Sequence, residues 1–309
     1  MMKRIFAALI LLSFSDNRLW AGQGQPDKNY QKHSLKRIVI DAGHGGSDYG
    51  ASGSKSHEKD ITLAVALELQ KAINDQMPDV DVYMTRTTDV FDRVTVKASK
   101  ANAAKGDLFV SIHCNDAGRI RHTEIEGYKT VTRKRKGKKV TSKVPIYHSW
   151  TTPNPAKGTE TYIWGVNKDD DKEKAVREGD NEVLDSLSAK ELKNFDPNDP
   201  AQILAISLRT QQYAERSRNL AITVEDEFAK SGRISRGARQ RNEKGIWVLQ
   251  ATNMPAILIE VGFLSNPEEE DYLMSKEGQE ETANTIVRAL KRYKYSLDNK
   301  LLSNKQQQK

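Results

Sequence analysis

Short apolar segments alternate with longer segments of helical periodicity through most of this chain. We expect strands at 38–40, 80–85, 108–112, 159–164, 246–249 and 256–259, and helices at 61–73, 92–104, 201–230, 268–275 and 278–297. Helices between strands provide the crossover connections that parallel strands need. We therefore predict an α/β fold, a single three-layer domain. Its mostly parallel or mixed sheet has about six strands and is covered by helices on both faces.

Two charged insertions interrupt this alternation. The basic insertion, 119–157, contains KTVTRKRKGKKVTSK at 129–143, with eight Lys or Arg and no acidic residue. The acidic insertion, 168–200, holds eleven Asp or Glu against six Lys or Arg. We expect the basic insertion to form a loop that grips an anionic glycan or a membrane surface, and the alternative is a solvated surface hairpin. Nucleic acid is not an expected partner of an exported protein.

The N-terminus has the features of a secretory signal peptide. Lys3 and Arg4 precede a short apolar run, and Ala21 offers a small residue for cleavage, so we assign residues 1–21 to the signal. A retained membrane anchor is the alternative. We predict export to the periplasm, with extracellular release as the second option. A linker at 22–36 precedes the catalytic domain at 37–297, and a flexible tail follows at 298–309.

Cys114 is the only cysteine, so the chain cannot form an internal disulfide. The residue follows a histidine at the end of an apolar strand. A nucleophilic thiolate needs nearby stabilising charge, and none is evident in the sequence. We therefore expect Cys114 to be a small buried residue of the core.

The segment VIDAGHGGSDYGASGSKSHEKD, Val39 to Asp60, contains a glycine-rich turn after a strand. A dinucleotide-binding loop would need a third glycine where Asp48 stands, and a phosphate loop would need a following lysine. An acidic side chain at that position repels phosphate, which excludes both nucleotide motifs. The histidine of the turn leaves a metal site as the interpretation to test.

Three apolar strands end in residues that can bind a metal, His44, His113 and Glu260. The carboxyl ends of parallel strands meet at one edge of a sheet, where ligands gather. Glu58 opens a helix just after the loop from His44, with Ser56 as the expected N-cap. Two histidines and one carboxylate are the ligand set of a catalytic zinc, and a second carboxylate would serve as general base.

Each of these residues also has a structural interpretation. Histidines at strand ends often make structural hydrogen bonds and bind no metal. The carboxylate of Glu58, in a first helical turn, would interact favourably with the partial positive charge at the helix N-terminus. Glu260 is harder to explain in this way, because a carboxylate in a buried strand is costly unless it is paired or bound to a metal. His57 competes with Glu58, but adjacent side chains diverge, so only one should reach the site.

Six segments in order resemble the zinc-dependent N-acetylmuramoyl-L-alanine amidases of the Amidase_3 family, of the cell-separation type. They are IVIDAGHGGSDYGA, HEKDITLAVALELQKAI, VYMTRTTDVF, AKGDLFVSIHCND, KGTETYIWG and MPAILIEVGFLSNPEEEDYL. The resemblance implies one Zn²⁺ per chain, held by His44, Glu58 and His113, with Glu260 as catalytic glutamate. Asn115 and Arg86 are candidates for orienting the ligands or the substrate, and structural roles are the alternative for both.

The implied reaction is hydrolysis of the amide between N-acetylmuramic acid and L-alanine in peptidoglycan, for wall remodelling or daughter-cell separation. Two alternatives are another wall zinc hydrolase, either a peptidase or a deacetylase, and a non-catalytic peptidoglycan-binding module. Cell-separation members carry a regulatory helix at the place of the acidic insertion. Our hypothesis is that residues 172–187 form such a helix and that Glu178 or Glu182 occupies the open zinc position until a protein activator displaces it; the alternative is a solvated, charge-rich face.

Overall fold

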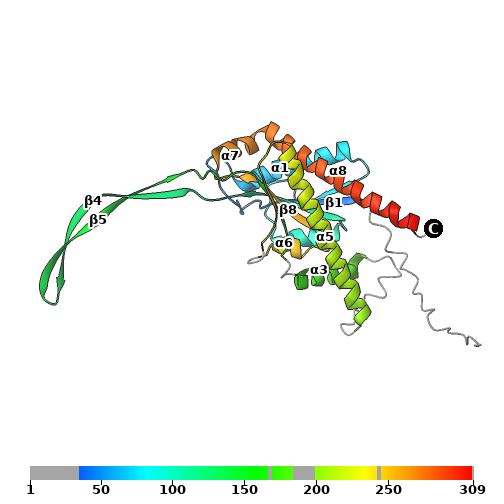
Figure 1. Ribbon diagram of the computed structural model, residues 1–309, viewed down its shortest axis with the longest axis horizontal. Helices are drawn as coiled ribbons and strands as arrows, with labels where there is room; N and C mark the ends of the chain where they lie inside the picture. The colour runs from blue at the N-terminus through cyan, green and yellow to red at the C-terminus, as the bar shows by residue number, and fades with distance from the viewer. Residues whose placement is uncertain (1–34, 166–168, 184–198, 242–244, 308–309) are drawn as a thin grey trace, which may run out of the picture. The chain divides into compact units, whose positions relative to one another are not determined.

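Six strands form the central sheet in the order β2-β1-β3-β8-β6-β7. Figure 1 labels two of them, β1 and β8, among the helices. Their bounds are Arg37–Ala42 (β1), Asp81–Met84 (β2), Leu108–Asn115 (β3), Thr159–Ile163 (β6), Ser235–Gln240 (β7) and Ala256–Phe263 (β8). β6 runs antiparallel to β8, and all other neighbours in the sheet are parallel. The computed structural model describes residues 35–165, 169–183, 199–241 and 245–307, all within one compact unit, Ser34–Lys309.

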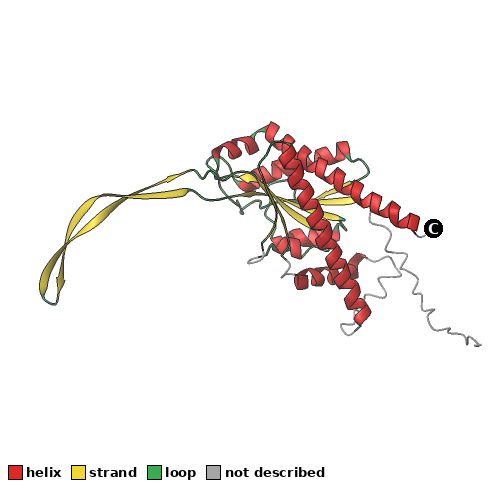
Figure 2. Ribbon diagram, viewed as in Figure 1, coloured by secondary structure: helices red, strands yellow, loops and turns green. Residues whose placement is uncertain are grey.

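Helices cover both faces of the sheet (Figure 2). Their bounds are Glu58–Gln76 (α1), Val94–Ala103 (α2), Asp169–Val183 (α3), Pro200–Lys230 (α5), Trp247–Gln250 (α6), Pro267–Met274 (α7) and Lys276–Gln307 (α8). Side chains alternate across a strand, so Ile38 and Ile40 pack in one core with residues of α1, α5 and α8, while Val39 packs in another with residues of α2 and α6. The predicted three-layer α/β fold is confirmed.

One edge of the sheet differs from the prediction. The expected strand at 246–249 is wrong. Ile246 is the N-cap of the short helix α6, Trp247–Gln250, and the sixth strand is β7. The strand β7 reads SRGARQ and is only partly buried, so it lacks the apolar run that marks the inner strands. Helix α8 continues to Gln307, past the predicted boundary at 297.

The basic insertion forms a two-stranded antiparallel hairpin, the shape named in the alternative interpretation, and its expected grip on a glycan or a membrane surface stays a prediction. Its strands are β4 (Ile120–Arg135) and β5 (Lys138–Thr152), joined by a two-residue turn at Lys136 and Gly137. Both turn residues have positive φ, 49° and 77°, as in the turns that match strand twist. Among the described residues, no helix has the length and apolarity needed to cross a bilayer.

Candidate metal centre

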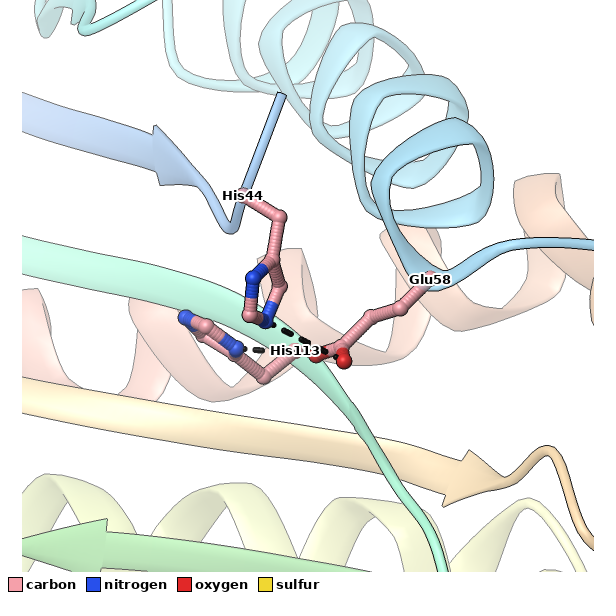
Figure 3. A group of neighbouring side chains, drawn as sticks. All are labelled: His44, Glu58 and His113. Atoms are coloured by element: carbon pink, nitrogen blue, oxygen red, sulfur yellow. Dashed lines mark hydrogen bonds and ion pairs between the residues drawn. The ribbon is translucent and has the colours of Figure 1, made fainter. Parts of the chain in front are cut away.

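His44, Glu58 and His113 converge at the carboxyl-end edge of the sheet (Figure 3). His44 follows β1, Glu58 is the first residue of α1, and His113 lies in β3. Glu58 Oε2 is 3.1 Å from His44 Nε2, and Glu58 Oε1 is 2.9 Å from His113 Nδ1. One ligand atom from each residue lies within 4.8 Å of the others, so the three side chains can bind one metal ion.

The polar surroundings of this group suit a divalent cation. Burial alone would raise the pKa of Glu58, but hydrogen bonds with His113 and His44 outweigh it and hold the pKa well below its usual range. The carboxylate also accepts hydrogen bonds from the backbone N–H groups of Ala51 and Cys114. His44 Nδ1 is 2.9 Å from Asp48 Oδ2, an arrangement that orients the ring and leaves Nε2 for a metal. The donor set therefore fits zinc.

The turn before α1 needs glycine at Gly50. Its φ is +66°, and an added Cβ would lie 2.6 Å from both Glu58 Oε2 and His44 Cδ2. We expect Gly50→Ala to lower zinc affinity at least tenfold, because the methyl group would displace two ligands. A competitive-chelator titration would measure this change.

Gly232→Ala is the matched control for Gly50→Ala. Gly232 also has positive φ, +85°, but its Cβ would meet no atom within 4 Å. We expect it to lose about 1 kcal/mol of stability from backbone strain and to keep its zinc affinity. Equal zinc affinity in the two variants would show that the turn does not constrain the site.

Glu260 lies beside this group in the neighbouring strand. It is the Cα partner of His113 in the β3–β8 register and is 7% exposed. Its Oε2 has no hydrogen-bond partner among the described residues, and Arg241 Nη2 lies 4.0 Å from its Oε1. Burial raises the pKa of Glu260 to about 7. A buried carboxyl with an unpaired oxygen beside a metal-binding group can take and release a proton near neutral pH.

The raised pKa has a consequence for stability in the metal-free protein. The folded state binds the Glu260 proton more tightly than the unfolded chain, in which the pKa of this carboxyl is near 4.5. Burying the ionised carboxylate therefore lowers the free energy of unfolding progressively as the pH rises from about 4.5 to about 7. We expect Glu260→Gln to raise the free energy of unfolding by about 3 kcal/mol at pH 8, and by much less at pH 5. Urea unfolding with a chelator at both pH values tests this, and a gain independent of pH would contradict it.

Arg86 and Asn115 both make hydrogen bonds within the protein. Arg86 is 3% exposed and donates to the backbone oxygens of Ala42, Gly43 and Lys59, so it joins the His44 turn to α1. Asn115 donates to Glu160. The backbone of α3 includes positions 178 and 182, but the side chains of Glu178 and Glu182 lie outside the described residues, as does the signal segment 1–21.

Helix α1 begins differently from the expectation. The N-cap is His57 rather than Ser56, whose backbone N–H and side-chain Oγ both donate to Glu270 Oε1. His57 Nδ1 is 3.0 Å from Ser52 Oγ, and His57 is not part of the metal-binding group. Cys114 is buried as expected, and burial raises the pKa of its thiol well above the ordinary value.

The sequence interpretation missed Glu160 on β6. It is 3% exposed, pairs with Glu260 across the β6–β8 register and accepts hydrogen bonds from Tyr162 and Arg236. Burial would raise the pKa of Glu160, but these hydrogen bonds keep it below the ordinary value. Glu160 has the same sequence feature that identified Glu260, namely an acidic residue inside a buried strand.

Comparisons with known proteins agree with this geometry. The Amidase_3 profile, described as N-acetylmuramoyl-L-alanine amidase, matches residues 38–292. The amidase AmiC of Escherichia coli O6:H1 is 30% identical over 257 residues, covering 83% of this chain and 52% of AmiC. The chain thus spans about half the length of this relative.

Two solved structures share the fold and 26% sequence identity. The catalytic domain of CwlV from Bacillus (Paenibacillus) polymyxa var. colistinus has a TM-score of 0.53, with 84% of this chain and 98% of that chain covered. An N-acetylmuramoyl-L-alanine amidase from Clostridium difficile 630 has a TM-score of 0.52, with 84% and 97% covered. Because the family profile spans nearly the whole sheet and its helices, the chain belongs to the Amidase_3 family of N-acetylmuramoyl-L-alanine amidases.

Proposed function

We propose that this protein is a zinc-dependent amidase that cleaves the bond between N-acetylmuramic acid and the L-alanine of the stem peptide in peptidoglycan. The observation that carries the proposal is the buried carboxyl of Glu260, whose Oε2 has no hydrogen-bond partner among the described residues, beside the group of His44, Glu58 and His113. Binding alone needs no such base next to a metal site, and family membership supports the choice of substrate.

His44, Glu58 and His113 would hold the zinc ion, and a catalytic zinc keeps a further position open. When bound, zinc supplies Lewis-acid chemistry that polarises the amide carbonyl and acidifies water. Asp48 orients the His44 ring, and the backbone donors at Ala51 and Cys114 fix the Glu58 carboxylate. The ligands are therefore held in position by the fold.

Glu260 is the proposed general base and acid. In its ionised form it accepts a proton from the attacking water, and it then delivers that proton to the nitrogen of the departing L-alanine. Its burial favours the protonated form, which helps the second step. A bound cation would lower this pKa and favour the first step, so the residue can serve both.

A soluble fragment of N-acetylmuramic acid carrying a stem peptide provides the direct test. The zinc-loaded protein is expected to release a peptide with a free L-alanine amine, and a chelator is expected to stop the reaction. Release of acetate, or a cut inside the peptide, would assign the site to a different hydrolase.

We also propose that the acidic insertion lowers basal activity until a protein activator displaces it. The support from the structure is that the insertion forms a helix, α3, within the predicted range 168–200; its Lys172 anchor lies before the amino end of β8, at the opposite end of the sheet from His113 and Glu260. Lys172 is fully buried and donates to the backbone oxygens of Leu249, Thr252 and Met254. Glu178 and Glu182, further along the helix, are the proposed source of the occluding carboxylate.

The double variant Glu178→Gln/Glu182→Gln tests this autoinhibition while keeping the Lys172 anchor. We expect its basal turnover of the soluble fragment to rise at least fivefold, because an occluding carboxylate is lost. Asp170→Asn/Asp171→Asn removes the same charge from the exposed first turn of α3 and is expected to change turnover less than twofold. Deleting 168–200 would also remove Lys172, so it is the weaker test. Unchanged turnover in both variants would contradict autoinhibition.

The proposed place of action is the cell wall of the exporting organism. The signal-like segment at 1–21 supports export, to the periplasm or beyond the cell. The reaction would serve wall remodelling or the separation of daughter cells.

A further inference from the structure

The hairpin of β4 and β5 carries the entire net charge of the protein. Residues 120–152 hold nine Lys or Arg and two Glu, a net +7, and the whole chain also has a net charge of +7. The remainder of the chain is therefore neutral overall. A localised polycation on a neutral protein attracts a polyanion to that one element.

Positive charge surrounds the end of the hairpin on both faces. Directly opposed residues share a face, so Arg135 and Lys138 lie on one face, and Lys134 and Lys139 on the other. Like charges placed opposite each other destabilise a strand pair. An anionic partner that contacts both faces would remove this repulsion.

Exposed aromatic side chains occupy the half of the hairpin nearer the sheet. The ring of Trp150 stacks on His122 and His148, with centroids 5.3 and 5.6 Å apart. Trp150 is 40% exposed, and on the opposite face Tyr147 and Tyr128 are about 60% exposed. Flat rings of this kind pack against the C–H face of a sugar, and their polar edges accept or donate hydrogen bonds.

The hairpin connects β3, which carries His113, to β6, whose Glu160 pairs with Glu260. β4 starts five residues after Asn115, which ends the strand of His113, and β5 leads to β6. Strands of 16 and 15 residues span about 50 Å. A polymer held along the hairpin would therefore pass the same edge of the sheet that carries Glu260.

We propose that the β4–β5 hairpin binds the peptidoglycan strand itself, with its basic residues on stem-peptide carboxylates and its aromatic rings on the sugars. This inference rests on the proposed function. A lipid surface fits less well, because a bilayer contacts one apolar face of an element, whereas here charge and aromatic rings occupy both faces. Residues 134–139 at the turn of the hairpin, KRKGKK, also include no large apolar side chain that could insert into a bilayer.

Pelleting with purified sacculi tests the proposal, using full-length protein with Glu260→Gln to limit digestion. Hydrofluoric acid treatment of the sacculi first removes phosphate-linked polymers. At about 50 mM salt the triple hairpin variant K136Q/K138Q/K139Q is expected to bind at least tenfold more weakly than its parent, and the difference should shrink at 500 mM salt. The matched control K71Q/K230Q/K291Q removes three exposed charges elsewhere and should bind within twofold of its parent.

Trp150→Ala separates stacking from charge. We expect it to weaken pelleting at least threefold at both salt concentrations, with recovery in Trp150→Phe. Thermal unfolding should show the triple hairpin variant to be as stable as its parent, since it relieves like-charge repulsion.

Three outcomes would overturn the proposal. They are equal pelleting of all variants, binding lost when the phosphate polymers are removed, and charge-dependent binding to phosphatidylglycerol vesicles without binding to sacculi. The soluble-fragment assay on the parent protein reports separately on the proposed function. A parent that fails to cleave but pellets through its hairpin would retain this inference as a wall-binding property.

Discussion

Replacing Glu260 with glutamine is expected to lower kcat for the release of stem peptides by about a thousandfold, while the protein keeps one zinc per chain. Glutamine has nearly the same shape but cannot accept the proton of the attacking water, and general acid–base catalysis contributes about 10² to 10⁴ in rate. Glu260 lies outside the group of three ligand residues, so the metal should remain. Metal analysis and single-turnover release of L-alanine amines measure the two quantities.

The pH dependence of the parent enzyme provides the control for this role. The base works when ionised, so kcat/KM should fall as pH drops through its pKa. That pKa is about 7 in the metal-free protein, and a bound cation should move it lower. The glutamine variant should lose this acidic limb. A variant that cleaves at the parent rate would exclude Glu260 as the base.

Replacing either His44 or His113 with alanine is expected to reduce bound zinc to less than a tenth per chain and to lower turnover by more than a thousandfold. Each ring supplies one of only three protein ligands, and a site with two ligands cannot compete with water for the metal. Atomic absorption on protein purified without added chelator measures the content.

His57→Ala is the matched control for the two histidines. His57 precedes Glu58 directly, but its ring contacts Ser52 and Tyr49. This variant should retain zinc and turnover within about twofold of the parent. Loss of zinc from His57→Ala, or retention by His44→Ala, would require a different ligand set.

The inner strands could be predicted from the sequence because both of their faces are buried. β1, β3 and β8 are continuous apolar runs, and the alternation with helices then determines the layers. The edge strand β7 is polar and half exposed, so no apolar run marks it, whereas the apolar residues of α6 have the composition of a buried strand. The hairpin strands contain the Thr and Val residues that favour strands, but the many Lys and Arg residues between them made a solvated loop the expectation.

The candidate site was predicted from the same apolar strands. His44, His113 and Glu260 each interrupt or end a buried run, and Glu58 follows a glycine-rich turn that brings it to His44. The carboxylates that support them were not recognised. Asp48 lies in a loop without periodicity, and Glu160 contacts Asn115 only through the fold. A long-range partner such as Glu160 depends on strand order, which local patterns do not specify.

Mass spectrometry of sacculi digested by the zinc-loaded protein tests the central claim most directly. The account predicts free stem peptides that begin with an L-alanine amine, together with glycan strands that keep their N-acetyl groups. Cuts inside the peptides would indicate a peptidase, deacetylated glycan a deacetylase, and intact sacculi a binding module. Any of these three results would contradict the proposed amidase activity.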